Sequence, residues 1–226
     1  MQGDVAMKKE IRLEKIIPEY STIEIKQKDQ NVWSKSIVLN VLGRFIEVKQ
    51  IEQFLSSAII TGDILQCMVV DKSNIYLMDA TVYNIKLITG SIVLEVNDFK
   101  TVVNERKHKR YNVLLSATFH KAGKLKECYG VVLNISLSGL CIITNCELNQ
   151  DDIIEVLINN PNVNPILAQY TVKWSVDKGQ KKMHGLSITN IDDKNRFLLS
   201  DLINKLEMSE QNEIKRLMES KQDQFF

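Results

Sequence analysis

The stretch RKHKRYNVLLSATFHK, residues 106–121, joins a basic tract to a run of alternating apolar and polar residues. Alternation with a period of two indicates a β-strand with one buried face. The residues expected to face inward are Tyr111, Val113, Leu115, Ala117 and Phe119. This segment therefore predicts a half-buried strand that begins directly after five basic or titratable residues.

A second polar motif, NISLSG, occupies residues 134–139. Taken alone, such a run is typical of a polar turn that leaves a strand. Taken alone, the basic tract Arg106–Arg110 is equally typical of a solvated surface patch. The order and spacing of the two motifs favour a functional interpretation of both.

Together the motifs resemble the signature of the PilZ family, Arg-x-x-x-Arg followed by Asp/Asn-x-Ser-x-x-Gly. Every signature position is filled, and the resemblance extends over about residues 105 to 206. PilZ domains are bacterial receptors for cyclic di-GMP, so the resemblance implies a small β-barrel that binds this ligand. The implied ligand contacts are Arg106, Arg110, Asn134, Ser136 and Gly139, with Lys107, Ser138 and His184 as weaker candidates.

The chemistry of cyclic di-GMP suits these residue types. The planar donor fork of arginine matches the adjacent O6 and N7 acceptors of guanine, pairs with phosphate and stacks on a purine face. Asn134 and Ser136 can supply directional hydrogen bonds to a guanine edge or a phosphate. Gly139 permits either a positive φ or a backbone approach that a Cβ would prevent.

Composition predicts an ordinary globular protein. The chain has 226 residues, 44% of them hydrophobic, and a formal net charge of +1, which favours one large or two modest domains. This charge gives no reason to expect nucleic-acid binding. The opening residues 1–10 do not form a signal peptide and no apolar run is long enough to span a membrane, so we expect a cytoplasmic protein.

The four cysteines and three histidines do not match a metal-binding pattern. Cys67, Cys128, Cys141 and Cys146 include no Cys-x-x-Cys pair, and no histidine lies near enough to complete a zinc site. We therefore expect reduced, partly buried thiols, with neither a metal nor a cofactor.

The N-terminal half contains short strand-like runs separated by turn residues. The expected strands are 20–25, 32–42, 44–48, 64–70, 75–87 and 92–96, with a loop or a short helical turn at 50–58. This layout resembles the YcgR-like flagellar-brake architecture, in which a PilZN domain precedes the PilZ domain. Another small β domain is the alternative. The predicted domains are 1–99 and 106–226, joined by a linker at 100–105.

The C-terminal half continues with strands at 140–144, 153–158, 168–176 and 184–189, and with a turn at 159–162. Trp174 shares an apolar face with Tyr170 and Val172, which favours a core position over a platform on which ligand stacks. Asp192 or Asp193 can cap a terminal helix. Its apolar face is expected to comprise Phe197, Leu198, Leu202, Ile203 and Leu206, and to plug the barrel. The fold class is thus mainly β: two small antiparallel barrels or split barrels and a C-terminal α-helix.

The favoured function is a non-enzymatic cyclic di-GMP receptor in which the ligand changes the geometry between domains. The implied output is a flagellar motor or stator protein, or an envelope-polymer synthase, contacted by a monomer or a homodimer. A PilZ-fold adaptor that acts without nucleotide is the first alternative. A nucleic-acid-binding barrel is a second, and sparse aromatics near the basic tract argue against it. An enzyme has the least support, because no catalytic constellation stands out.

Overall fold

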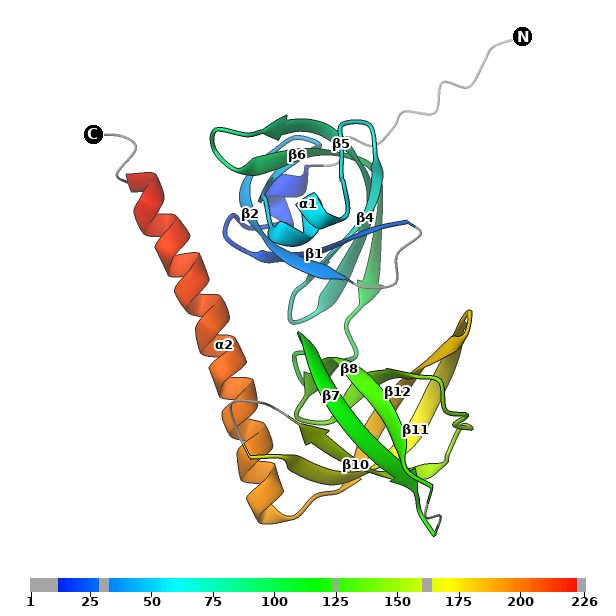
Figure 1. Cartoon of the computed structure of the whole chain (residues 1–226). Coiled ribbons are helices and arrows are strands. Elements are labelled where there is room, and N and C mark those ends of the chain that lie inside the picture. Colours follow the sequence, from blue (N-terminus) through cyan, green and yellow to red (C-terminus); the bar gives the residue numbers. More distant parts are fainter. Residues whose placement is uncertain (1–11, 29–32, 124–125, 160–163, 223–226) are drawn as a thin grey trace. The chain divides into compact units, whose positions relative to one another are not determined.

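The computed structural model describes residues 12–28, 33–123, 126–159 and 164–222 (Figure 1). The chain divides into two compact units, Met1–Glu105 and Arg106–Phe226. Each unit has its own closed antiparallel barrel, and a long helix ends the second. The predicted fold class is confirmed.

The first unit closes six strands in the order β1-β2-β3-β6-β5-β4. The strands are β1 (Thr22–Gln27), β2 (Ser34–Leu42), β3 (Phe45–Lys49), β4 (Ile64–Val70), β5 (Asn74–Lys86) and β6 (Ser91–Val103). Alternating side chains fill the interior, as in β1, where Ile23 and Ile25 are buried. The short helix α1 (Glu52–Ser56) lies across one opening of the barrel, and a 3-10 turn at Leu13–Lys15 adds the buried Leu13.

The predicted linker at 100–105 is largely strand. β6 continues through Val103, which pairs with Asn74 of β5. Residues 100–103 lack an apolar alternation because all four are exposed, whereas main-chain hydrogen bonds to β5 hold them. The side-chain pattern reports burial and cannot detect a strand that extends beyond the core.

The second unit closes six strands in the order β10-β11-β12-β9-β8-β7. They are β7 (Tyr111–Lys121), β8 (Cys128–Ser136), β9 (Gly139–Thr144), β10 (Ile153–Asn159), β11 (Ile166–Lys178) and β12 (Lys181–Asn190). The sequence predicted one strand between the two motifs, and the structure has two, β7 and β8. Asn159 ends β10, and the rest of the predicted turn lies outside the described residues.

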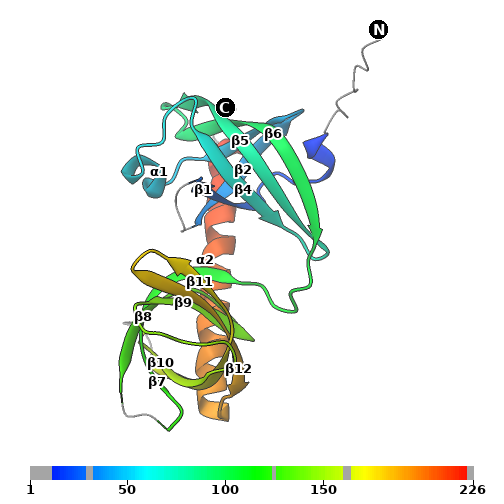
Figure 2. The ribbon, with the colours of Figure 1, turned by 90° about the vertical axis from the view of Figure 1, so that its right-hand side faces the viewer.

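Helix α2 (Asp193–Gln222) packs against β11 and adds its first turns to the core of the second barrel (Figure 2). The Asp192 carboxylate accepts hydrogen bonds from the Asn195 backbone and side chain, both at 2.7 Å, and these lower its pKa. This confirms Asp192 as the cap.

The apolar face of α2 differs in part from the predicted one. The most buried side chains are Leu199, Leu202 and Ile203, whereas Phe197 is 73% exposed. Phe197 was predicted to face the core, and Leu199 was missed. The two residues lie about 200° apart around a helix, so they cannot share one face. The prediction holds for Leu202 and Ile203, which are buried, and for Leu198 and Leu206, which pack partly buried against the core.

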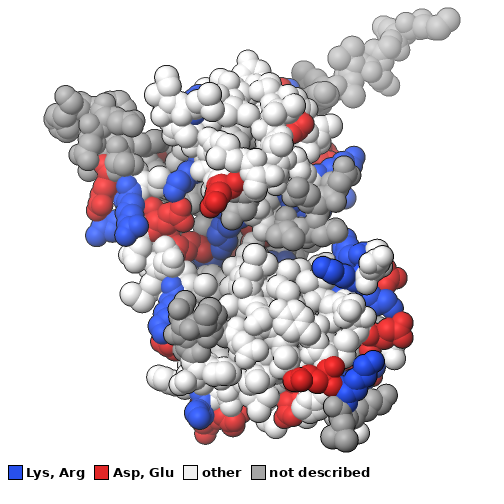
Figure 3. Space-filling model, in the orientation of Figure 1, with Lys and Arg blue, Asp and Glu red and all other residues white. Residues whose placement is uncertain are grey.

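The surface carries mixed charge. Figure 3 shows Lys and Arg interspersed with Asp and Glu, together with a broad uncharged area on the visible face of the second unit. In the described part of the chain, no helix is long and apolar enough to cross a bilayer.

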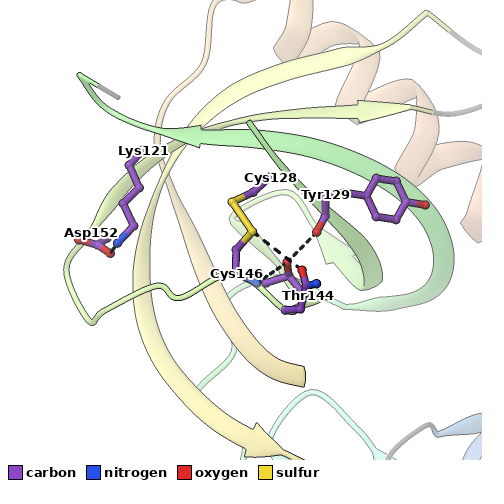
Figure 4. Close-up of a disulfide and its surroundings, with 7 residues drawn as sticks. Lys121, Cys128, Tyr129, Thr144, Cys146 and Asp152 are labelled. Carbon is purple, nitrogen blue, oxygen red and sulfur yellow. Dashed lines mark hydrogen bonds and ion pairs between the residues drawn. A yellow bond between two sulfur atoms is a disulfide. The ribbon is translucent and has the colours of Figure 1, made fainter. Parts of the chain in front are cut away.

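A disulfide joins Cys128 at the start of β8 to Cys146 after β9 (Figure 4). The prediction of four reduced thiols is therefore wrong for this pair, while Cys67 and Cys141 are free and buried. The two cysteines lie 18 residues apart in sequence, and hairpin pairing of β8 with β9 brings their Cα atoms within 6.3 Å. The Thr144 hydroxyl reinforces this end of the hairpin, because it donates to the Tyr129 carbonyl at 2.6 Å.

We expect that breaking the disulfide lowers the free energy of unfolding of the second barrel. Closing a loop of this length in the unfolded chain is worth roughly 3 kcal/mol by the chain-entropy relation. Urea unfolding of Cys128→Ser should show this loss, and wild type in dithiothreitol should match the variant. A midpoint that neither change moves would show that the disulfide does not stabilise the barrel.

Candidate functional site

The second polar motif forms the turn between β8 and β9 and is held by its own serine. Ser136 is 3% exposed, and its hydroxyl donates to the Gly139 carbonyl at 3.1 Å. The Ser138 backbone N–H in turn donates to the Ser136 hydroxyl at 3.3 Å. Ser136 therefore organises the turn, while Ser138 is exposed beside it. Removing this hydroxyl would break the turn's hydrogen bonds, so Ser136 contributes to the stability of the turn.

Close packing of the β9 backbone against the β12 backbone requires a glycine at position 139. It lies opposite Ser187 in the pairing of β9 with β12, and a Cβ at this position would collide with the Leu186 carbonyl oxygen. Its φ is not in the left-handed region, so the close approach, and not a positive φ, explains the glycine. The approaching backbone is that of β12, which places Gly139 at the closure of the barrel.

A cavity of about 130 Å³ opens beside this turn, and we name it the motif cavity. It collects four residues of the two motifs: Arg110, Ser136, Ser138 and Gly139. Two further strands supply the opposite wall, β11 with Lys173 and Trp174, and β12 with Gly185, Leu186 and Ser187. Barrel closure thus brings together residues that lie up to 77 positions apart, from Arg110 to Ser187.

Trp174 is a cavity residue and not the predicted core residue. It is 37% exposed, whereas Tyr170 and Val172 of the same strand are buried. The pairing of β11 with β12 shifts register between Val172 and Trp174, and this bulge takes Trp174 out of the inward alternation. Its indole lies against the cross-strand partner Gly185, where any Cβ would meet the ring.

The cavity wall is electropositive. Arg110 and Lys173 supply two cationic side chains, and no Asp or Glu is among the described residues that line it. Cys141, also in the wall, has its pKa raised to about 11 by burial, which the Arg110 guanidinium partly offsets. The thiol is thus neutral at pH 7. Lys173 Nζ lies 4.0 Å from the Asp151 carboxylate, which is outside the wall, so Arg110 supplies the positive charge that no ion pair of the described residues offsets.

His184, a weaker predicted contact, is fully buried. Its Nδ1 lies 2.7 Å from the Ser175 hydroxyl, and its Nε2 is buried without a hydrogen-bond partner among the described residues. Burial, assisted by Lys182, lowers the pKa of the imidazole, so the ring is neutral at pH 7. In this structure His184 does not reach the cavity that its neighbour Gly185 lines.

Three other predicted contacts lie away from the cavity wall. Arg106 and Lys107 are exposed in the basic tract, and Asn134 is half-buried near the end of β8. The described walls of the motif cavity include none of the three. Lys109 ties the tract to α2 through a 2.7 Å ion pair with Glu210.

A second, larger cavity of about 520 Å³ lies next to the motif cavity, and we name it the α2 cavity. The two cavities share Ser138 and Ser187, which form the ridge between them. His108 of the basic tract and Arg196 of the first turn of α2 also line the α2 cavity. Arg196 could not be predicted from the sequence as a cavity residue, because a lone arginine at the start of a helix has no motif around it.

Comparison with known protein families identifies this part of the chain. Residues 104–205 match the family model described as the PilZ domain. These residues form a PilZ domain. The match covers both motifs and all six strands of the second barrel, and it confirms the resemblance inferred from the sequence.

Several solved structures are similar over most of the chain. The Bacillus subtilis inhibitor of motility MotI/DgrA is 14% identical, with a TM-score of 0.41, over 84% of this chain and 97% of that one. The K. pneumonia MrkH–c-di-GMP complex is 12% identical, with a TM-score of 0.48, over 86% and 90%. Escherichia coli YcgR in complex with c-di-GMP is 9% identical, with a TM-score of 0.47, over 88% of each chain. Among curated proteins, none matches this sequence.

Proposed function

We propose that this protein is a receptor for cyclic di-GMP and that its PilZ domain binds the ligand at the motif cavity. The observation that carries the proposal is the meeting of Arg110, the Ser136–Gly139 turn and Trp174 in one electropositive wall. Cyclic di-GMP has two phosphates and two guanines, so it needs cations, directional donors and a flat apolar surface. The motif cavity offers all three.

Arg110 is the central contact in this proposal. It is exposed at the end of the basic tract, and none of the ion pairs of the described residues involves it. A guanidinium in this state can bind a guanine edge through O6 and N7, or a phosphate, without first giving up an acidic partner. Lysine at this position would retain the charge but lose the two-pronged geometry.

Trp174 supplies the flat surface. Base–aromatic stacking contributes about 1–3 kcal/mol per base in single-stranded nucleic-acid complexes, and the same contact is available to a guanine of cyclic di-GMP. Gly185 leaves room for the indole against β12, because a side chain there would occupy the same space. The ring is therefore already positioned before the ligand arrives, which reduces the entropy lost on binding.

The ligand must extend beyond the motif cavity. A volume of about 130 Å³ lies well below the roughly 300–1,000 Å³ that is usual for pockets of drug-sized ligands. The exposed residues Arg106 and Lys107 begin the same basic tract, and we propose that they contact the part of the ligand outside the cavity. Asn134 remains a proposed contact that would require local adjustment of the end of β8.

An adaptor that uses the PilZ fold without nucleotide is the alternative. The absence of Arg106 and Asn134 from the described cavity wall favours it, because two of the five signature residues are then not assembled. Exposed apolar side chains at Leu114 (76%) and Tyr129 (59%) would offer such an adaptor a contact surface. Ligand binding decides between the two functions.

Isothermal titration with cyclic di-GMP tests the proposal. Wild type should bind, and Arg110→Ala should raise Kd by roughly 10- to 150-fold, the range that corresponds to a lost hydrogen bond with a charged group. Lys194→Gln removes an equally exposed positive charge that lines neither cavity, and it should bind like wild type. Failure of wild type to bind would favour the adaptor, and an unchanged Kd in Arg110→Ala would remove this residue from the site.

We also propose that binding changes the arrangement of the two units. The support is positional: the first signature arginine, Arg106, is the first residue of the second unit. Contacts from Arg106 and Arg110 to the ligand would fix the backbone at the boundary, and ordering of a segment is a known route to a change in domain geometry. Small-angle scattering should then show a different radius of gyration with saturating cyclic di-GMP. Identical curves with and without bound ligand would mean that the output is the ligand-covered surface itself.

The finer assignments belong to the same proposal. We place the receptor in the cytoplasm without catalytic activity of its own, and we assign the first unit to a PilZN-like role. Its output partner would be a flagellar motor or stator protein, or an envelope-polymer synthase. Co-purification of the full chain with each class of partner, with and without cyclic di-GMP, tests this part, and equal recovery in both conditions would reject a ligand-controlled partner.

A further inference from the structure

The α2 cavity is a feature of the second unit that the signature motifs do not explain. Its polar walls include His108, Ser138, Ser187, Asn190, Arg196 and Ser200. The described lining contains no Asp or Glu. This set of hydroxyls, an amide, an imidazole and a guanidinium suits an anion with hydrogen-bonding edges.

Arg196 is the permanent charge in this cavity. It is exposed on the first turn of α2, and its Nη2 makes a long, 3.4 Å hydrogen bond to the Ile191 carbonyl. None of the ion pairs of the described residues uses it. The guanidinium thus has unused donors at a cavity wall, and a phosphate can accept two of them at once.

The α2 cavity adjoins the proposed ligand site. Ser138, in the motif turn, and Ser187, opposite Gly139 on β12, line both cavities. Its volume of about 520 Å³ falls inside the usual range for ligand pockets, which the motif cavity does not reach. A ligand anchored at Arg110 therefore has a polar path over this ridge into a space large enough for a nucleotide.

We infer that the nucleotide site extends over Ser138 and Ser187 into the α2 cavity, where Arg196 binds a phosphate of cyclic di-GMP and His108 lines the same space. This inference rests on the proposed function and adds to it a contact outside both signature motifs. It makes the first turn of α2 part of the binding site. Any shift of Arg196 on binding is then transmitted to a 30-residue helix.

The test compares two substitutions on the same helical turn. Arg196→Gln removes the charge in the cavity, and Lys194→Gln removes an exposed charge two residues away that does not line it. Titration calorimetry with cyclic di-GMP should show a Kd at least fivefold higher for Arg196→Gln and unchanged for Lys194→Gln. Both variants should melt like wild type, because neither side chain is buried in the core.

The dependence of Kd on salt concentration separates a phosphate contact of Arg196 from a purely structural role, which would leave this dependence unchanged. Loss of a phosphate contact should make the Kd of Arg196→Gln less sensitive to sodium chloride than that of wild type, because one ionic contact fewer is screened. Equal Kd values and equal salt dependence for the two variants would overturn the inference. Binding lost in Arg110→Ala but intact in Arg196→Gln would reject only the extension, whereas absence of binding by wild type would overturn the proposed function and this inference together.

Discussion

The second barrel depends on the close approach of β9 and β12 at Gly139. The backbone of Gly139 lies so near the Leu186 carbonyl that no side chain fits between them. This contact closes the sheet at the point where the motif turn ends, and it brings Ser187 of β12 beside Ser138 of the turn. The glycine of the signature is thus a structural requirement of the barrel. The same closure forms the ridge of Ser138 and Ser187 between the two cavities.

A bulge provides the other decisive local feature. In a regular strand, Trp174 would follow Tyr170 and Val172 into the core. The register shift after Val172 turns it to the surface instead, over the bare backbone of Gly185. The core loses one aromatic side chain, and the cavity gains a flat apolar surface beside Arg110. The bulge therefore places Trp174 in the wall of the motif cavity and not in the core.

Regular strands could be predicted from the sequence, whereas a bulge and contacts between distant residues could not. An apolar run located β4 at its observed bounds, and short strand-like runs at even spacing predicted both barrels. Alternation placed inward-facing side chains at every second position. The same rule placed Trp174 in the core, since a bulge leaves no mark in one sequence. It could not pair Cys128 with Cys146, because their approach results from the β8–β9 hairpin. Motif spacing found Arg110 and the turn, whereas Arg196 reaches the neighbouring cavity only through the path of α2.

The most direct test of the central claim is the fluorescence of Trp174 during titration with cyclic di-GMP. Trp33 is the only other tryptophan, so a Trp33→Phe variant reports on Trp174 alone. If guanine stacks at the motif cavity, this emission should change and saturate with the Kd that calorimetry gives, and Arg110→Ala should shift the whole curve to higher ligand concentration. Calorimetric binding without any change in Trp174 emission would place the ligand elsewhere and contradict the account.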